Sequence, residues 1–219
     1  MAVGVVGLTG TIFLQYFAFD LGNILEANVI AYAWPLFVAV WAAWLLRNMQ
    51  GWVGLILAGI GFVCVLLIFD AQGDLRLSSG NEIGYLVAIA SALCMAFYTV
   101  VSARIHVQGD QLLIPAAVVG ALIAFTPSSM QDMAWPPLHA WWTAAYIGVG
   151  PMAAGFFLWT FAMSGDGAKT LAPIGYATPL LSTMLLLSSG EGFTSRTLVG
   201  AAMVLVCSLG VLATERIWR

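Results

Sequence analysis

The 219-residue chain is predicted to be an all-α integral membrane protein. Hydrophobic residues make up 62% of the sequence and charged residues only 8%, whereas soluble domains carry about a quarter charged residues. The apolar residues form continuous runs of roughly 20, the length at which a helix crosses a bilayer core. Because these runs lack the alternation of lipid-facing and lumen-facing residues in barrel strands, we expect helices rather than a β-barrel.

Eight transmembrane helices are expected, since charged or Gly/Pro-rich breaks divide the chain into segments of spanning length. In chain order, these divisions lie at or directly beside Asp20, Arg47, the connection 70–82, Arg104, the connection 128–139, Lys169 and Arg196. The expected helices lie at about 1–20, 24–46, 51–69, 83–104, 111–128, 140–163, 171–189 and 197–214. In the fourth, the alanines spaced by four are expected to let neighbouring helices approach closely: Ala88, Ala92 and Ala96.

Lysine and arginine predict the orientation, because cytoplasmic loops of membrane proteins are enriched in them. With the N-terminus in the cytoplasm, the basic residues on the inside are Arg47, Arg104, Lys169, Arg216 and Arg219. Only Arg76 and Arg196 then lie outside. We therefore expect the C-terminus to be cytoplasmic.

Two parts of the chain match each other at an offset of 144 residues. The segment "IAYAWPLF" begins at residue 30 and "IGYATPLL" begins at residue 174. The same offset aligns further identical pairs: Gly4 with Gly148, Val5 with Val149, Phe13 with Phe157, Leu14 with Leu158, Phe17 with Phe161 and Ala18 with Ala162. These matches exceed chance for two spans of this composition, so we interpret them as an internal repeat.

The repeat begins in the first expected helix and again in the sixth, and an odd number of crossings reverses the chain direction. The halves are therefore expected to be inverted, a plan of secondary transporters that place a binding site near the bilayer midplane. Residues 83–214 form a complete five-helix unit, whereas residues 1–70 supply the last three helices of the other unit. Two helices of a ten-helix arrangement are thus missing, and whether from the gene or only from this sequence stays open.

This pattern resembles the drug/metabolite transporter superfamily, whose EamA repeats form a ten-helix pair of five-helix halves. In that family, the fourth helix of each half carries small residues before a proline. Ala27 and Ala31, followed by Pro35, match this pattern. Residues 84–105 resemble the opening helix of a second EamA unit, and "YAWP" resembles the aromatic amino acid exporter (YddG-type) branch. The resemblance implies a multi-pass transporter of the bacterial inner membrane that exports amino acids, with an aromatic preference, by alternating access. A broader metabolite or drug exporter of the same fold is the alternative.

Pro35 and Pro179 lie within expected helices at equivalent positions of the repeat. A mid-span proline leaves the carbonyl one turn earlier, at Ala31 or Gly175, without its intrahelical donor, and lipid supplies none. Such a carbonyl suits a wet cavity, where it can accept a hydrogen bond from a substrate ammonium. We interpret both prolines as marking a substrate site; a packing kink satisfied by a neighbouring side chain is the alternative.

Aromatic and polar residues within the spans are the other candidates for substrate binding. Tyr32 and Tyr176 precede the two prolines by three residues, so each shares a helix face with its proline. Trp34 lies mid-span, away from the interfaces where tryptophan collects, and a buried indole suits a flat aromatic ligand. Gln15 and Tyr98 are further polar candidates. For all five residues the alternative is ordinary helix packing or an interhelical hydrogen bond.

Charged side chains are absent from the middle of every expected helix, where ion-driven carriers usually place one. The substrate is therefore expected to be neutral or zwitterionic. Asp20 and Glu26, at the outer ends of the first two helices, are interpreted as solvated residues at the mouth of the site. Asn28, one turn deeper, is left ambiguous.

Other classes of protein find less support in the sequence. A membrane-embedded enzyme needs a placed base, nucleophile or metal cluster, yet His106 and His139 are solitary and lie in loops on opposite sides of the membrane. We therefore expect no enzyme activity, no cofactor and no metal. A structural membrane subunit that transports nothing is the remaining alternative. The expected partners are small molecules and the lipid bilayer, not nucleic acid.

Overall fold

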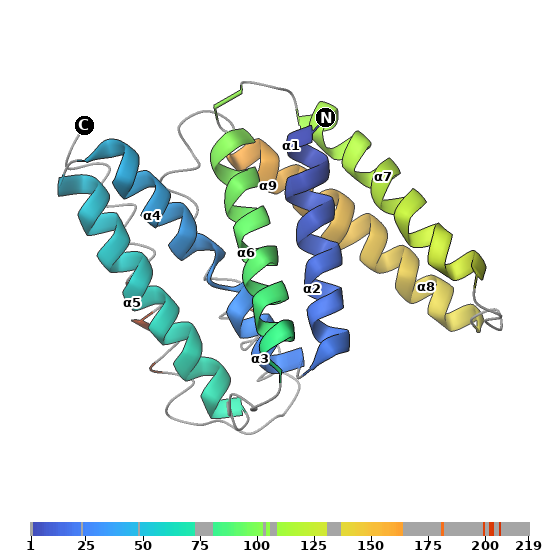
Figure 1. Ribbon diagram of the computed structural model, residues 1–219, viewed down its shortest axis with the longest axis horizontal. Helices are drawn as coiled ribbons and strands as arrows, with labels where there is room; N and C mark the ends of the chain where they lie inside the picture. The colour runs from blue at the N-terminus through green and yellow to red at the C-terminus, as the bar shows by residue number, and fades with distance from the viewer. Residues whose placement is uncertain are drawn as a thin grey trace.

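The computed structural model describes residues 2–22, 24–47, 49–72, 81–102, 104–105, 109–130 and 137–163, with a few single positions further along the chain (Figure 1). Every regular element in this part of the chain is helical, which confirms the all-α prediction. The helices expected at 171–189 and 197–214 lie outside the described residues, apart from single positions.

The described helices follow the first six expected spans. The first span consists of α1 (Ala2–Gly4), a π-helical turn η1 (Val5–Thr9) and α2 (Gly10–Leu21). The second consists of α3 (Ile24–Ala31) and α4 (Trp34–Leu46), separated by a turn. The next three are α5 (Met49–Gln72), α6 (Glu82–Ser102) and α7 (Gly109–Met130). The sixth consists of α8 (Leu138–Ile147), a π-helical segment η2 (Gly148–Gly155) and α9 (Phe156–Met163).

Four spans are long and apolar enough to cross a membrane, counting described residues alone: Ala2–Leu21, Glu26–Leu45, Glu82–Ser102 and Leu138–Ala162. α5 and α7 contain shorter apolar stretches, Gly51–Cys64 and Gln111–Phe125. With the hydrophobic composition, these helices make the chain a multi-pass membrane protein.

α6 lies at the centre of the described helices, where it packs most extensively against α2 and also against η1, α3, α4 and α9 (Figure 1). Small residues permit this close packing: Ala88, Ala92 and Ala96 are at most 2% exposed, as their spacing predicted. Ser91 of α6 adds a direct bond, because its hydroxyl donates to the carbonyl oxygen of Thr11 in α2 at 2.8 Å. The helix that opens the second expected unit thus packs mainly against helices of the first.

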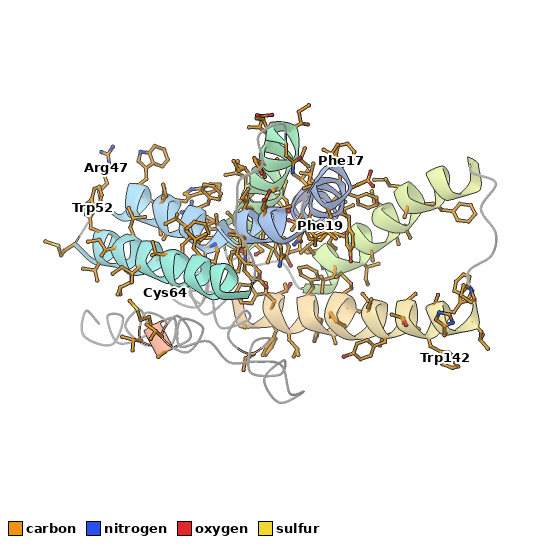
Figure 2. The ribbon with its side chains drawn as sticks, turned by 90° about the horizontal axis from the view of Figure 1, so that it is seen from below. Phe17, Phe19, Arg47, Trp52, Cys64 and Trp142 are labelled. Carbon is orange, nitrogen blue, oxygen red and sulfur yellow. The ribbon has the colours of Figure 1, made fainter. Side chains whose placement is uncertain are left out.

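The remaining spans flank this centre on two sides. α4 and α5 form a hairpin on one flank, and Arg47 after α4 has a positive φ of 48°, a left-handed residue of the kind that commonly ends a helix (Figure 1). α8, η2 and α9 run along one side of the other helices, as Figure 2 shows. No residue of α8 is buried, and Trp142 on it is 73% exposed.

Candidate substrate site

The second span is broken in its middle, between α3 and α4. The break follows from Pro35, which has no N–H to donate to the carbonyl oxygen of Ala31, four residues earlier. The backbone forms tighter turns instead: the Ala33 N–H donates to the Ile30 carbonyl at 3.0 Å, and the Leu36 N–H donates to the Ala33 carbonyl at 3.0 Å. Neither donor serves the carbonyl of Ala31.

Pro35 is less than 2% exposed, so its ring is packed against protein and not against lipid. Before it, Ala31 is buried and Tyr32 is half-buried. The break therefore lies inside the described bundle, and interrupted helices inside transporters commonly line the substrate site. The residues expected at the equivalent place in the other half lie outside the described part of the chain: Gly175, Tyr176 and Pro179.

Two tryptophans from distant spans meet beside this break. The ring of Trp34, at the start of α4, contacts the ring of Trp159, on α9, with centroids 5.3 Å apart and an interplanar angle of 88°. This edge-to-face arrangement is one that the quadrupoles of two aromatic rings favour. Both indoles are half-buried and pack against one apolar cluster, formed by Leu8, Met95, Tyr98, Leu112 and Ala116. Trp34 thus lies among protein side chains, and its role in substrate binding stays a prediction.

The indole Nε1–H of Trp159 is buried and has no hydrogen-bond partner among the described residues. Buried indole donors usually find an acceptor, and one left unsatisfied costs about 1–3 kcal/mol. The unpaired donor therefore marks this tryptophan as a residue that the packing of the described helices does not fully explain.

Tyr98 of α6 is fully buried, and its hydroxyl forms a hydrogen bond with the hydroxyl of Thr160 on α9. The Thr160 hydroxyl donates its proton to the carbonyl of Phe156 at 2.8 Å, so Tyr98 is the donor in the hydroxyl pair. Tyr98 therefore has an interhelical partner, which is one of the two roles that its sequence position allowed. Its ring also belongs to the apolar cluster that both tryptophans contact.

Gln15 and Asn28 form a polar pair between α2 and α3. The Gln15 side-chain amide donates to the Asn28 side-chain oxygen at 3.2 Å, and both residues are half-buried. Such pairs are a common means of joining membrane helices, because lipid offers polar groups no alternative partner. The structure thus places Gln15 in a helix–helix contact and gives Asn28 the same role.

Glu26 is 2% exposed, so its interpretation as a solvated mouth residue is wrong. Its carboxylate accepts a hydrogen bond from the Tyr85 hydroxyl of α6 at 2.5 Å. The reason is close packing, because small residues bring α2, α3 and α6 near enough to enclose a side chain between them. One alanine from each helix forms a buried cluster there: Ala18, Ala27 and Ala88.

Three residues of this region lie outside the set expected from the sequence: Trp159, Thr160 and the buried Glu26. A signal for Trp159 did exist, since the offset of 144 that relates "IAYAWPLF" to "IGYATPLL" pairs Trp159 with the candidate Gln15. No comparable signal marks Glu26, because Asp20 has similar chemistry at the same end of the spans and is exposed as expected.

The groups around the two tryptophans suit binding more than bond-making chemistry. They offer flat apolar rings, neutral hydroxyls and a backbone carbonyl, the combination found in sites for small organic ligands. Within the described ranges, no three His, Cys, Asp or Glu side chains lie close enough together to hold a metal ion.

Comparisons with known proteins indicate a transporter. The model of the EamA-like transporter family matches residues 82–213. A protein of Ancylobacter novellus named "Aromatic amino acid exporter YddG" is 31% identical over 209 residues, which cover 94% of this chain and 71% of that protein. A solved crystal structure is similar with a TM-score of 0.85 and 26% identity, over 96% of this chain and 76% of that chain.

Proposed function

The chain belongs to the EamA-like transporter family, and on this premise we propose that it exports small neutral or zwitterionic solutes, above all aromatic amino acids. One observation carries the substrate preference, the edge-to-face pair of Trp34 and Trp159 beside the break at Pro35. Indole faces bind flat aromatic rings well, because ring burial and quadrupole geometry both contribute. The name of the Ancylobacter relative supports the same substrate class.

The side chains around the tryptophan pair favour a solute without net charge. The apolar cluster that contacts both indoles contains no charged residue: Leu8, Met95, Tyr98, Leu112 and Ala116. A solute with net charge would lose its hydration there without a counter-charge, which is costly. A zwitterion can place its ammonium against a backbone carbonyl. The carbonyl of Ala31 is suited to this contact, because Pro35 has no N–H to donate to it.

We propose that residues 1–70 and 83–214 are inverted halves that rock about a shared midplane site. The family match at 82–213 supports the position of the second half. The π-helical turns support the repeat, since an offset of 144 pairs η1 with residues 149–153, which lie inside η2. π-helical turns are rare and occur frequently at functional sites, so two at paired positions agree with one ancestral helix used twice.

The proposed location is the bacterial inner membrane, with both termini in the cytoplasm. The helix contacts support this orientation. Ala27 packs with Ala88, and Val38 packs with Val100, so the second span runs in the same direction as α6. The basic residues that follow these two spans, Arg47 and Arg104, therefore lie at the same end of the bundle.

Efflux from loaded proteoliposomes tests this proposal. We expect the protein to release labelled phenylalanine faster than labelled lysine or glutamate. Trp34→Ala should slow phenylalanine efflux by about tenfold, because losing a buried aromatic contact costs on the order of 1.4 kcal/mol. Trp142→Ala is the matched control, since it removes an exposed indole from α8 and should leave efflux unchanged.

Two other outcomes of the efflux assay would favour the alternative functions. Equal efflux of aromatic, aliphatic and cationic solutes would favour a broad metabolite or drug exporter of the same fold. No efflux of any solute from proteoliposomes that hold folded protein would contradict the transport proposal and favour a non-transporting membrane subunit. Thermal unfolding of each variant in detergent reports whether it has folded.

A further inference from the structure

The unpaired Nε1–H of Trp159 lies among groups that are already engaged. The adjacent Thr160 hydroxyl donates to the Phe156 carbonyl and accepts from Tyr98. The ring of Trp34 meets the Trp159 ring edge to face, a contact that favours the observed orientation of the indole. The indole thus presents a positioned hydrogen-bond donor for which the described helices provide no acceptor.

We propose that the Trp159 Nε1–H donates a hydrogen bond to an oxygen atom of the transported solute. The transported solutes are then those that carry a carboxylate or carbonyl oxygen next to an apolar or aromatic side chain. This inference rests on the transport function proposed above and deepens it, because it names the residue that recognises the acceptor group. A bound solute would supply the acceptor that the described helices do not provide, and an indole donor in contact with Trp34 loses little conformational freedom on binding.

The Trp159 N–H donor complements a hydrogen-bond acceptor at the helix break, the carbonyl of Ala31. Ala31 lies three residues before Trp34, and its carbonyl lacks the usual backbone donor because of Pro35. An amino acid offers an ammonium to such a carbonyl and a carboxylate to the Trp159 indole. An arylalkylamine without oxygen can make only the contact between its ammonium and the carbonyl. The site should therefore bind such an amine less tightly than an amino acid.

Efflux of three related solutes from proteoliposomes measures this discrimination: phenylalanine, phenylalaninamide and 2-phenylethylamine. The first two carry an acceptor oxygen, and the third has a hydrogen atom in place of the carboxyl or carboxamide group. The parent protein should move phenylalanine and phenylalaninamide with a lower KM than 2-phenylethylamine. Since phenylalaninamide and 2-phenylethylamine both lack a carboxylate, the difference between these two measures the contribution of the oxygen apart from that of the carboxylate charge. Trp159→Phe should raise the KM for the two oxygen-bearing solutes about tenfold and leave that for 2-phenylethylamine within twofold.

Trp142→Phe is the matched control, because it removes an exposed indole N–H from α8 of the same span. It should change none of the three KM values. A second variant at residue 159 carries 3-benzothienylalanine, in which sulfur replaces the N–H and the two-ring shape is kept. This variant should reproduce the tenfold rise in KM, while the thermal unfolding temperature without solute stays equal to that of the parent or increases, since no protein hydrogen bond is lost.

The outcomes distinguish this inference from the function on which it rests. Phenylalanine efflux by the parent, with an unchanged preference for oxygen-bearing solutes in both residue-159 variants, would overturn the inference and leave the transport proposal intact. A lower unfolding temperature for the benzothienyl variant without solute, at unchanged KM, would also overturn it by showing a structural bond. Absence of efflux for all three solutes in the parent would overturn the transport proposal and the inference together.

Discussion

The first and sixth spans each contain a π-helical turn, but the two turns have different surroundings. In η1 the consecutive residues Gly7, Leu8 and Thr9 are buried, and the turn packs against α6 and α7. In η2 no residue is buried, and none is buried in α8 before it. Figure 2 shows the sixth span along the outside of the described helices.

The two turns also differ in what produces them. η2 contains Pro151, whose missing N–H interrupts the α-helical hydrogen bonds of its own span. η1 contains no proline, and side chains stabilise it: the Thr11 hydroxyl donates to the Gly7 carbonyl at 2.5 Å, and the Thr9 hydroxyl donates to the Ala116 carbonyl of α7 at 2.8 Å. A proline within the span thus accompanies the feature in η2, whereas in η1 one side-chain bond within the span and one bond to α7 accompany it. Matched substitutions should therefore have unequal effects.

A glycine in each π-helical segment gives the largest expected contrast. A Cβ added at Gly7 would lie 2.5 Å from the Cβ of Tyr98, whereas a Cβ added at Gly148 meets nothing within 4 Å. We expect Gly7→Ala to lower the free energy of unfolding by about 3 kcal/mol through overpacking. Gly148→Ala should raise it by about 0.5–1 kcal/mol, since alanine favours a helix over glycine. Unfolding in detergent micelles measures both, and equal effects would contradict the packing of η1 on α6.

Two tyrosines give the next contrast, between the packed centre and α8. Tyr85→Phe removes the hydroxyl that donates to the buried Glu26 carboxylate, so we expect a loss of about 2 kcal/mol in stability. Tyr146 on α8 is 74% exposed, and Tyr146→Phe should change the stability by less than about 0.5 kcal/mol. The same unfolding assay compares them. A silent Tyr85→Phe variant would show that the carboxylate does not depend on this donor.

Two threonines give the smallest expected contrast. The Thr9 hydroxyl reaches a carbonyl of another helix, whereas the exposed Thr143 hydroxyl donates to the His139 carbonyl of its own helix at 3.2 Å. Valine keeps the side-chain shape and removes the hydroxyl, so Thr9→Val should cost about 1 kcal/mol and Thr143→Val close to nothing. If the two variants unfold alike, the bond between η1 and α7 adds no measurable stability.

Helix positions and the break at Pro35 could be predicted from the sequence, because both depend on local chemistry. Each described span begins and ends within three residues of its expected range, and the interruption lies in the turn immediately before Pro35. The burial of Glu26 and the contact between Trp34 and Trp159 could not be predicted, because each needs helices that are far apart in the chain to approach. The repeat offset paired Trp159 with Gln15, but only packing reveals that the indole donor is unpaired.

The central position of α6 affects how the protein is made. A ribosome releases α1 to α5 before α6, so these helices enter the bilayer before the helix against which they pack. These helices remain in the bilayer without their main packing partner until residues 82–102 insert. The start of the family match at residue 82 is therefore not a boundary for assembly. A fragment that began at Glu82 would expose to lipid the alanine face of α6 that the earlier helices cover.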